Sequence, residues 1–195
     1  MLMNHAVRRK IAPAHEFLRR QKVDLFFTVL RPDREDSLLD VGGGLGISGE
    51  FAAVYDFFPD VTTLNILPRS DSDSELKCFV QGNACSMPFA DQSFDWVFSN
   101  AVIEHVGDRK SQRMMADEIR RVARLGYFIA TPNWWFPLDP HTMVPFYHWL
   151  PLSRTGPDPY WMLSTRDMQE LFPEAQAVSS GFATSVVSLH RRAAA

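Results

Sequence analysis

The chain has 195 residues, a length that fits one compact domain, and its 20 Lys and Arg against 23 Asp and Glu give a net charge of −3. This balance argues against a dedicated nucleic-acid-binding protein, because no surplus of cations is available to neutralise phosphates. The two cysteines, Cys78 and Cys85, are too few for a disulfide scaffold. We recognise neither a signal peptide nor an apolar run of the ~18 residues that a membrane span needs, so we expect a soluble, cytoplasmic protein.

Helical and strand-like segments alternate along the chain. The first is an amphipathic helix predicted at 13–30, whose polar face we expect to be solvated, with a lid over a binding site as the alternative. Further helices are predicted at 47–57, 108–125 and 165–172. Strands are predicted at 37–41, 61–66, 77–80, 94–99 and 127–131, and two more at 178–180 and 184–189 would form a hairpin around Gly181.

This alternation is typical of an α/β protein with a Rossmann-like, mostly parallel sheet, helices on both faces and a C-terminal antiparallel hairpin. We interpret residues 1–195 as one domain: a helical cap (1–36), a ligand-binding core (37–131), an aromatic and proline-rich segment (132–163), and a C-terminal helix with the hairpin (164–195). The ten residues 67–76 leave little room for a full crossover helix, so we expect a trimmed sheet edge. Ligands of such sheets bind at the carboxyl ends of the strands.

A glycine-rich turn, Gly42-Gly43-Gly44-Leu45-Gly46, follows the first predicted strand. Glycines let a ligand lie against the main chain, and the following helix presents free N–H groups to it. Residues 44–49 match the dinucleotide fingerprint G-x-G-x-x-G, but Asn65 stands where that fingerprint needs a carboxylate, and Asp40 is not part of it. An NAD(P)-dependent oxidoreductase is therefore the less favoured alternative.

Three segments together resemble the class I S-adenosylmethionine (SAM)-dependent methyltransferases, in the subgroup called methyltransferase type 11. Residues 39–46 are similar to the first motif of the family, 82–97 to its stretch G-D-A…P-F…S-F-D, and 99–106 to the segment after its fourth strand. The resemblance spans about residues 37–131. It implies SAM as the cofactor and an enzyme that moves a methyl group to a small or lipid-like acceptor, at O, N or C, by in-line displacement.

The same resemblance implies roles for individual residues. The implied cofactor-binding residues are Asp40, Gly42, Gly43, Gly44, Gly46, Asn65, Ile66, Asn83, Ala84, Ser99 and Asn100. The glycines would line the methionine part of SAM, with Asp40 supporting their loop and the ammonium group. Asn65 would lie at the ribose and Asn83 at the adenine. Ser99 and Asn100 would border the sulfonium.

The chain departs from the family pattern at Asn65 and Asn83, where members usually carry acids. An amide cannot offer the paired acceptors of a carboxylate to two ribose hydroxyls. We expect SAM binding to be weaker by ~1 kcal/mol or somewhat more. A non-catalytic SAM-binding or partner-binding protein of the same fold is therefore a further alternative.

His105 is the candidate catalytic residue. It follows the fourth strand on the cofactor's side of the sheet and could act as a base for an acceptor that must lose a proton; orientation or packing beside Glu104 is the alternative. We expect no metal site, because the chain contains no His-x-x-x-His or Cys-x-x-Cys spacing.

Acceptor specificity is expected in the segment 132–163, which holds eight aromatic residues. Its candidate acceptor-binding residues are Trp134, His141 and His148. The same aromatic density is compatible with a rigid cover over the sheet, a homodimer contact, or peripheral contact with a membrane surface.

Overall fold

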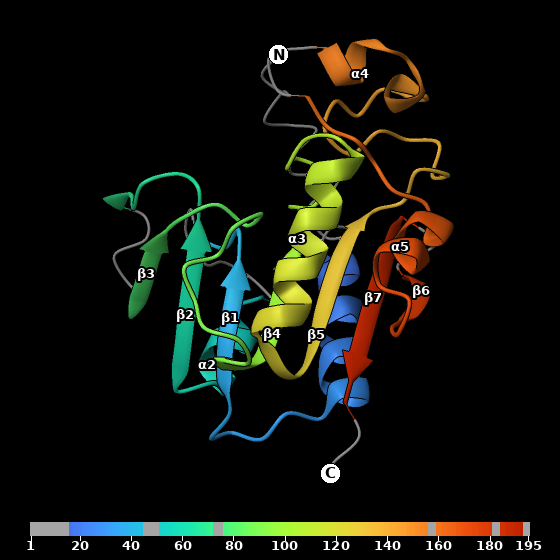
Figure 1. Ribbon diagram of the computed structural model, residues 1–195. Helices are drawn as coiled ribbons and strands as arrows, with labels where there is room; N and C mark the ends of the chain where they lie inside the picture. Colours follow the sequence, from blue (N-terminus) through green and yellow to red (C-terminus); the bar gives the residue numbers. More distant parts are fainter. Residues whose placement is uncertain (1–15, 45–50, 72–75, 156–158, 181–183, 193–195) are drawn as a thin grey trace.

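The computed structural model describes residues 16–44, 51–71, 76–155, 159–180 and 184–192. Seven strands form one sheet in the order β3-β2-β1-β4-β5-β7-β6 (Figure 1). They are β1 (Ser37–Val41), β2 (Asp60–Asn65), β3 (Cys78–Gln81), β4 (Phe94–Asn100), β5 (Ala123–Pro132), β6 (Gln176–Ser180) and β7 (Ser185–Arg191). The first five are parallel, β7 is antiparallel to β5, and β6 pairs antiparallel with β7. The expected fold class, including the C-terminal hairpin, is confirmed.

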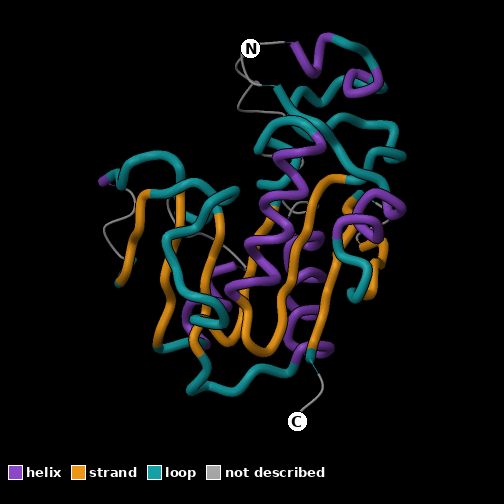
Figure 2. The backbone as a smooth tube through the Cα atoms, viewed as in Figure 1, coloured by secondary structure: helices purple, strands orange, loops and turns teal. Residues whose placement is uncertain are grey.

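Helices cover both faces of the sheet, as Figure 2 shows with helices on either side of the strands. The helical residues 16–25 continue into the π-helical turn η1 (Phe26–Leu30), and the other helical elements are α2 (Ala52–Phe57), α3 (Arg109–Val122), the 3₁₀ turn η4 (Tyr147–Trp149), α4 (Leu152–Thr155) and α5 (Thr165–Leu171). The starts of the helices predicted from 13 and 47, and the turn at Gly181, lie outside the described residues.

The alternation of side chains along the strands divides the core into two layers. Leu38 packs with the N-terminal helix and α2, whereas its neighbour Leu39 packs with α3 and α5. In the first layer Phe26 lies edge-on to Phe98 and Phe128, with ring centroids 5.7 and 5.6 Å apart. This aromatic cluster fixes the N-terminal helix against the centre of the sheet.

The boundary between α3 and β5 differs from the sequence prediction. The helical pattern predicts a helix up to 125 and a strand from 127, but α3 ends at Val122 and β5 begins at Ala123. Ala123 already pairs with Phe94 of β4, so strand pairing overrides the helical preference of the residues that follow. At the other edge, the described residues 66–71 and 76–77 contain no α-helix, in agreement with a trimmed edge.

The described residues 132–155 and 159–163 lie at the carboxyl ends of the parallel strands, at the top of Figure 1, and are called the cap from here on, as distinct from the N-terminal helical cap. The main-chain hydrogen bond from Trp134 N–H to Leu163 C=O (2.9 Å) joins the two ends of this cap, and the bond from Trp161 N–H to Glu104 C=O (2.7 Å) attaches the cap to the residues after β4. Among the described residues, no helix combines the length and the apolarity of a membrane span.

Gly126 of β5 offers a test of the sheet. A Cβ at this position would lie 2.0 Å from the main-chain oxygen of His190 on β7 and 2.8 Å from the Trp96 ring. We expect Gly126→Ala to lower the free energy of unfolding by about 2 kcal/mol or more, because the contact at β7 is with main chain that cannot rotate away. Urea unfolding followed by circular dichroism measures this, and an unchanged midpoint would contradict the pairing of β5 with β7.

Candidate functional site

Two neighbouring cavities lie at the carboxyl ends of the parallel strands. The first, of about 340 Å³, lies beyond β1, β2 and β3. Its walls include Gly42, Leu64, Asn65, Ile66, Gly82, Asn83, Ala84, Cys85, Val102, His105, Val106, Ser111 and Met114. Five of the residues predicted to bind the cofactor are in this set: Gly42, Asn65, Ile66, Asn83 and Ala84. We call it the cofactor cavity.

The glycine loop is required by the protein's own packing as well as by any ligand. Gly42 and Gly44 have φ values of +82° and +106°, a backbone region that favours glycine. A Cβ on Gly42 would lie 2.3 Å from a methyl group of Val102, and one on Gly43 would lie 2.1 Å from the Asp40 carboxylate. Gly46 lies outside the described residues.

Asp40 supports this loop from below. The Tyr55 hydroxyl of α2 donates a short hydrogen bond to the Asp40 carboxylate, which is buried beneath Gly43. Burial raises the pKa of Asp40 to about 6, although the bond from Tyr55 opposes the rise. Support of the loop by Asp40, implied by the family resemblance, agrees with this arrangement, and its contact with an ammonium group remains a prediction.

Asn65 lies where the ribose was expected, but its amide also binds the protein. Its Nδ2 donates to the carbonyl oxygen of Gly43 at 2.7 Å, and its Oδ1 accepts from the Leu67 N–H at 3.0 Å. An amide can do both, whereas a carboxylate here would face the Gly43 carbonyl without a proton to donate. The asparagine therefore fits the loop of this chain better than the usual acid would.

The second cavity, of about 570 Å³, lies under the cap beside the carboxyl ends of β4 and β5. Its walls are mostly apolar, from Leu18, Pro132, Phe136, Leu138, Pro140, Met143 and Met162, with Arg19, Lys22, Asn100, Ala101, Asn133, His105, His141, Thr184 and Ser185 as further lining. We call it the acceptor cavity. His105 lines both cavities, so its side chain stands at their junction.

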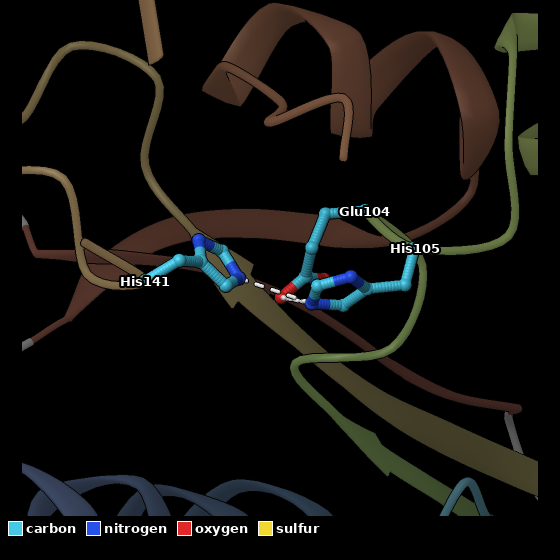
Figure 3. A group of neighbouring side chains, drawn as sticks. All are labelled: Glu104, His105 and His141. Carbon is cyan, nitrogen blue, oxygen red and sulfur yellow. Dashed lines mark hydrogen bonds and ion pairs between the residues drawn. The ribbon is translucent and has the colours of Figure 1, made fainter. Parts of the chain in front are cut away.

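Two further side chains, Glu104 and His141, lie next to His105 (Figure 3), and of these two only His141 lines a cavity. His105 Nε2 lies 3.0 Å from His141 Nε2 and 3.9 Å from Glu104 Oε1. Glu104 is completely buried, and Thr131 Oγ1 donates to its Oε2 at 3.0 Å. Burial raises the pKa of Glu104 to about 7, against the opposing effects of hydrogen bonding and of Lys22.

Asp139, in the cap, holds His141 in place. Its buried carboxylate accepts hydrogen bonds from the main-chain N–H groups of His141 (2.9 Å) and Thr142 (2.8 Å) and from the Tyr160 hydroxyl (2.5 Å). Burial alone would raise the pKa of Asp139, but the bonds from Tyr160 and Thr142 lower it. The Tyr160 ring in turn stacks on the His141 imidazole, with centroids 4.0 Å apart.

Two of the three predicted acceptor residues lie elsewhere. Of Trp134, His141 and His148, only His141 lines the acceptor cavity. His148 is buried, with Nε2 3.0 Å from the Trp134 carbonyl oxygen, and its ring contacts the Trp134 indole edge-on. These two rings therefore pack inside the cap.

Ser99 and Asn100, at the end of β4, were expected to border the sulfonium of the cofactor, but their contacts are with other parts of the protein. Ser99 is buried and donates to the Val41 carbonyl oxygen at 3.0 Å, which ties β4 to β1. Asn100 lines the acceptor cavity and accepts a hydrogen bond from Lys22 Nζ at 2.9 Å. Neither lines the cofactor cavity.

Lys22 lies on the polar face of the N-terminal helix, and the sequence alone does not assign it to the acceptor cavity. Its helix was expected to present this face to solvent, but Lys22 faces the acceptor cavity, where burial lowers its pKa to about 8. Arg19 and Arg20 on the same face are exposed, as a solvated face predicts, although Arg19 also lines the acceptor cavity. The alternative of a lid stays a prediction. The sequence signal for this position is helical spacing. Lys22 follows Leu18 by four residues, on a helix whose Val23 and Phe26 face the core.

Comparisons with known proteins identify the core. A family model described as a methyltransferase domain matches residues 39–130. Residues 39–130 form a methyltransferase domain of the type 11 family. The methyl donor of this domain is S-adenosylmethionine, as the sequence predicts. The cofactor cavity fits this donor, because glycine main chain lines it at the ends of β1 and β3, and apolar side chains of Ile66 and Met114 lie at its walls.

Solved structures support the fold over nearly the whole chain. A chain from the complex between the Haloferax volcanii Trm112 methyltransferase activator and the putative methyltransferase is 13% identical, with 98% of this chain and 99% of that one covered and a TM-score of 0.65. The magnesium protoporphyrin IX methyltransferase of Synechocystis, with bound S-adenosylhomocysteine (SAH), is 13% identical (99% and 90% covered, TM-score 0.63). The Burkholderia thailandensis 1,6-didemethyltoxoflavin-N1-methyltransferase is 15% identical (91% and 79% covered, TM-score 0.61). The comparison with curated proteins found no match.

Ile66 provides a test of the cofactor cavity that does not disturb the core. The side chain lines the cavity and is 67% exposed, so Ile66→Ala should leave the melting temperature unchanged. We expect it to weaken SAH binding roughly threefold to tenfold through lost apolar contact. Titration calorimetry measures the affinity, and Leu67→Ala, 51% exposed and outside the cavity lining, is the matched control. Equal affinities of the two variants would contradict the assignment of the cavity.

The raised pKa of Asp40 predicts a pH dependence of stability. Because the folded state holds this proton more tightly than the unfolded chain, stabilisation present below pH 4 is lost as the pH rises through about 6. Asp40→Asn should remove this loss, which amounts to at most roughly 3 kcal/mol. Urea unfolding between pH 4 and 8 gives the free energy of unfolding of each protein, and the loss appears as a steeper decrease of this free energy with pH in the wild type than in the variant. Parallel profiles of the wild type and the variant would show that Asp40 does not titrate in this way.

Proposed function

We propose that the chain transfers the methyl group of SAM to a small, largely apolar acceptor bound in the acceptor cavity, at an O, N or C nucleophile. The observation that carries this proposal is the position of His105, which forms part of the walls of both cavities. A reaction between a donor in one cavity and an acceptor in the other would take place beside this side chain.

The protein contributes to the reaction mainly by aligning the acceptor with the methyl group of SAM and by excluding water. Bound SAM would supply a methyl carbon on a sulfonium, to which an electron pair of the acceptor would form a bond while the bond to sulfur breaks to leave SAH. A hydroxyl or amine acceptor would also lose its proton, for which His105 is the proposed base. The protein must hold the nucleophile in line with that bond. His105 is the proposed catalytic residue, because at the junction its imidazole can contact the nucleophilic atom and orient it.

The walls of the acceptor cavity indicate the kind of molecule it accepts. Apolar side chains from the N-terminal helix and the cap, such as Leu18, Phe136 and Met143, would contact the body of the acceptor. Polar groups contribute from each side: Lys22 from the N-terminal helix is hydrogen-bonded to Asn100 at the end of β4, and His141 comes from the cap. An acceptor with an apolar body and one polar, nucleophilic end fits this distribution.

His105→Ala tests the proposal. We expect kcat for SAH formation, measured with a panel of small hydroxyl- and amino-bearing compounds, to fall at least ~100-fold. The affinity for SAH should stay within about threefold, because His105 is one of many side chains at the cofactor cavity. His190→Ala on β7, outside both cavities, is the matched control.

Two outcomes would contradict the proposal in different ways. Failure of the wild type to bind SAH at high micromolar concentration would overturn the cofactor site. Tight SAH binding without turnover of any acceptor would favour the non-catalytic SAM-binding or partner-binding alternative.

A further inference from the structure

Two imidazoles and one carboxylate meet at the wall of the acceptor cavity (Figure 3). Glu104 and His105 follow β4, whereas His141 comes from the cap after β5. One potential ligand atom from each residue lies within 4.8 Å of the other two. Because His105 and His141 are 36 positions apart, no local spacing in the sequence predicts a metal site here.

Glu104 provides an independent observation that points to a ligand. Its Oε2 is satisfied by Thr131, but its Oε1 is buried and has no hydrogen-bond partner. Buried carboxylate oxygens are paired in folded proteins, because an unpaired one loses its hydration without compensation. The unsatisfied Oε1 is the carboxylate atom nearest to the His105 ring, at 3.9 Å from Nε2.

We propose that Glu104, His105 and His141 bind a divalent first-row transition-metal ion at the wall of the acceptor cavity. Two imidazole nitrogens and one carboxylate oxygen are a ligand set that such ions favour. The His105 and His141 Nε2 atoms are 3.0 Å apart, which matches two adjacent ligands each about 2.1 Å from one ion. Oε1, at 3.9 Å from His105 Nε2, would move closer to the two imidazoles to complete this arrangement.

Neighbouring groups hold these ligands in position. Thr131 fixes the Glu104 carboxylate through Oε2 and leaves Oε1 directed toward the imidazoles. Asp139 binds the main chain of His141, and the Tyr160 ring stacks on its imidazole. Such outer contacts orient metal ligands in proteins and strengthen binding.

The role of the ion in this inference rests on the proposed function. His105 and His141 both line the acceptor cavity, so an ion bound to them would keep open positions facing the acceptor. There it would bind an oxygen of the acceptor and lower the pKa of a hydroxyl group, which favours acceptors that react through oxygen. The competing interpretation is a histidine pair joined by a hydrogen bond, with no ion.

Metal titration of the full chain separates the two interpretations. After treatment with a chelator and dialysis, we expect the protein to bind one equivalent of Co²⁺ with visible ligand-field absorption, and Zn²⁺ to displace it. His141→Ala should weaken Co²⁺ binding at least ~100-fold, more than the loss of an outer partner would. Glu104→Gln, which keeps the shape of the side chain, should weaken it at least ~10-fold.

Two controls separate a loss of metal binding from a loss of folding or of cofactor binding. His190→Ala should bind Co²⁺ within twofold of the wild type, and His141→Ala should keep its SAH affinity because His141 does not line the cofactor cavity. If a variant fails to fold, Zn²⁺-induced shifts of the His105 and His141 ring protons in the NMR spectrum of the wild type provide the same test.

Absence of Co²⁺ absorption, or binding that His141→Ala leaves unchanged, would overturn the metal site. SAH binding in that case would leave the proposed function standing. Metal binding by a protein that does not bind SAH would instead support the site and overturn the proposed function.

Discussion

The position of β4 between β1 and β5 is the constraint on which the site depends. Because these three strands are parallel, their carboxyl ends reach the same edge, so the glycine loop after β1, Glu104 and His105 after β4, and the cap after β5 meet there. The main-chain hydrogen bonds between these strands lie within the sheet, yet they determine which side chains line the same cavity. Covering helices on both faces bury the strands, and so the edge is the part of the core left open to a ligand.

Much of the fold could be predicted because its signals are local. Short apolar runs between turn residues gave β1 in full and placed β2, β3 and β4 within one residue at each end. The error at β5 has a physical cause: Ala123 pairs with Phe94, a contact between distant segments that no helical pattern contains. The sequence motifs also include Gly42, Asn65 and Asn83 of the cofactor cavity, because each lies at or just after the carboxyl end of a parallel strand.

The acceptor side could be predicted only in part, because its residues come together through tertiary contacts. His141 was chosen together with His148 from one aromatic segment, and nothing in that segment shows which ring faces the cavity. The difference arises from Asp139, which binds the main chain of His141, while His148 is turned inward against Trp134. Lys22 lies on the polar face of the N-terminal helix, and its hydrogen bond to Asn100 joins residues that are far apart in the sequence. The helical pattern alone therefore predicts only a solvated face. Glu104 was expected only as a neighbour of His105, and its burial could not be read from the sequence.

The imidazole at the junction of the two cavities has a consequence for how they fill. A side chain that belongs to two walls cannot turn toward one occupant without changing the space offered to the other. Affinities at the two cavities are then linked, and the linkage is reciprocal: whatever the first molecule gains or loses from the second, the second gains or loses equally from the first. The strength of this coupling would depend on the His105 ring and on Glu104 and His141, the groups that lie against it.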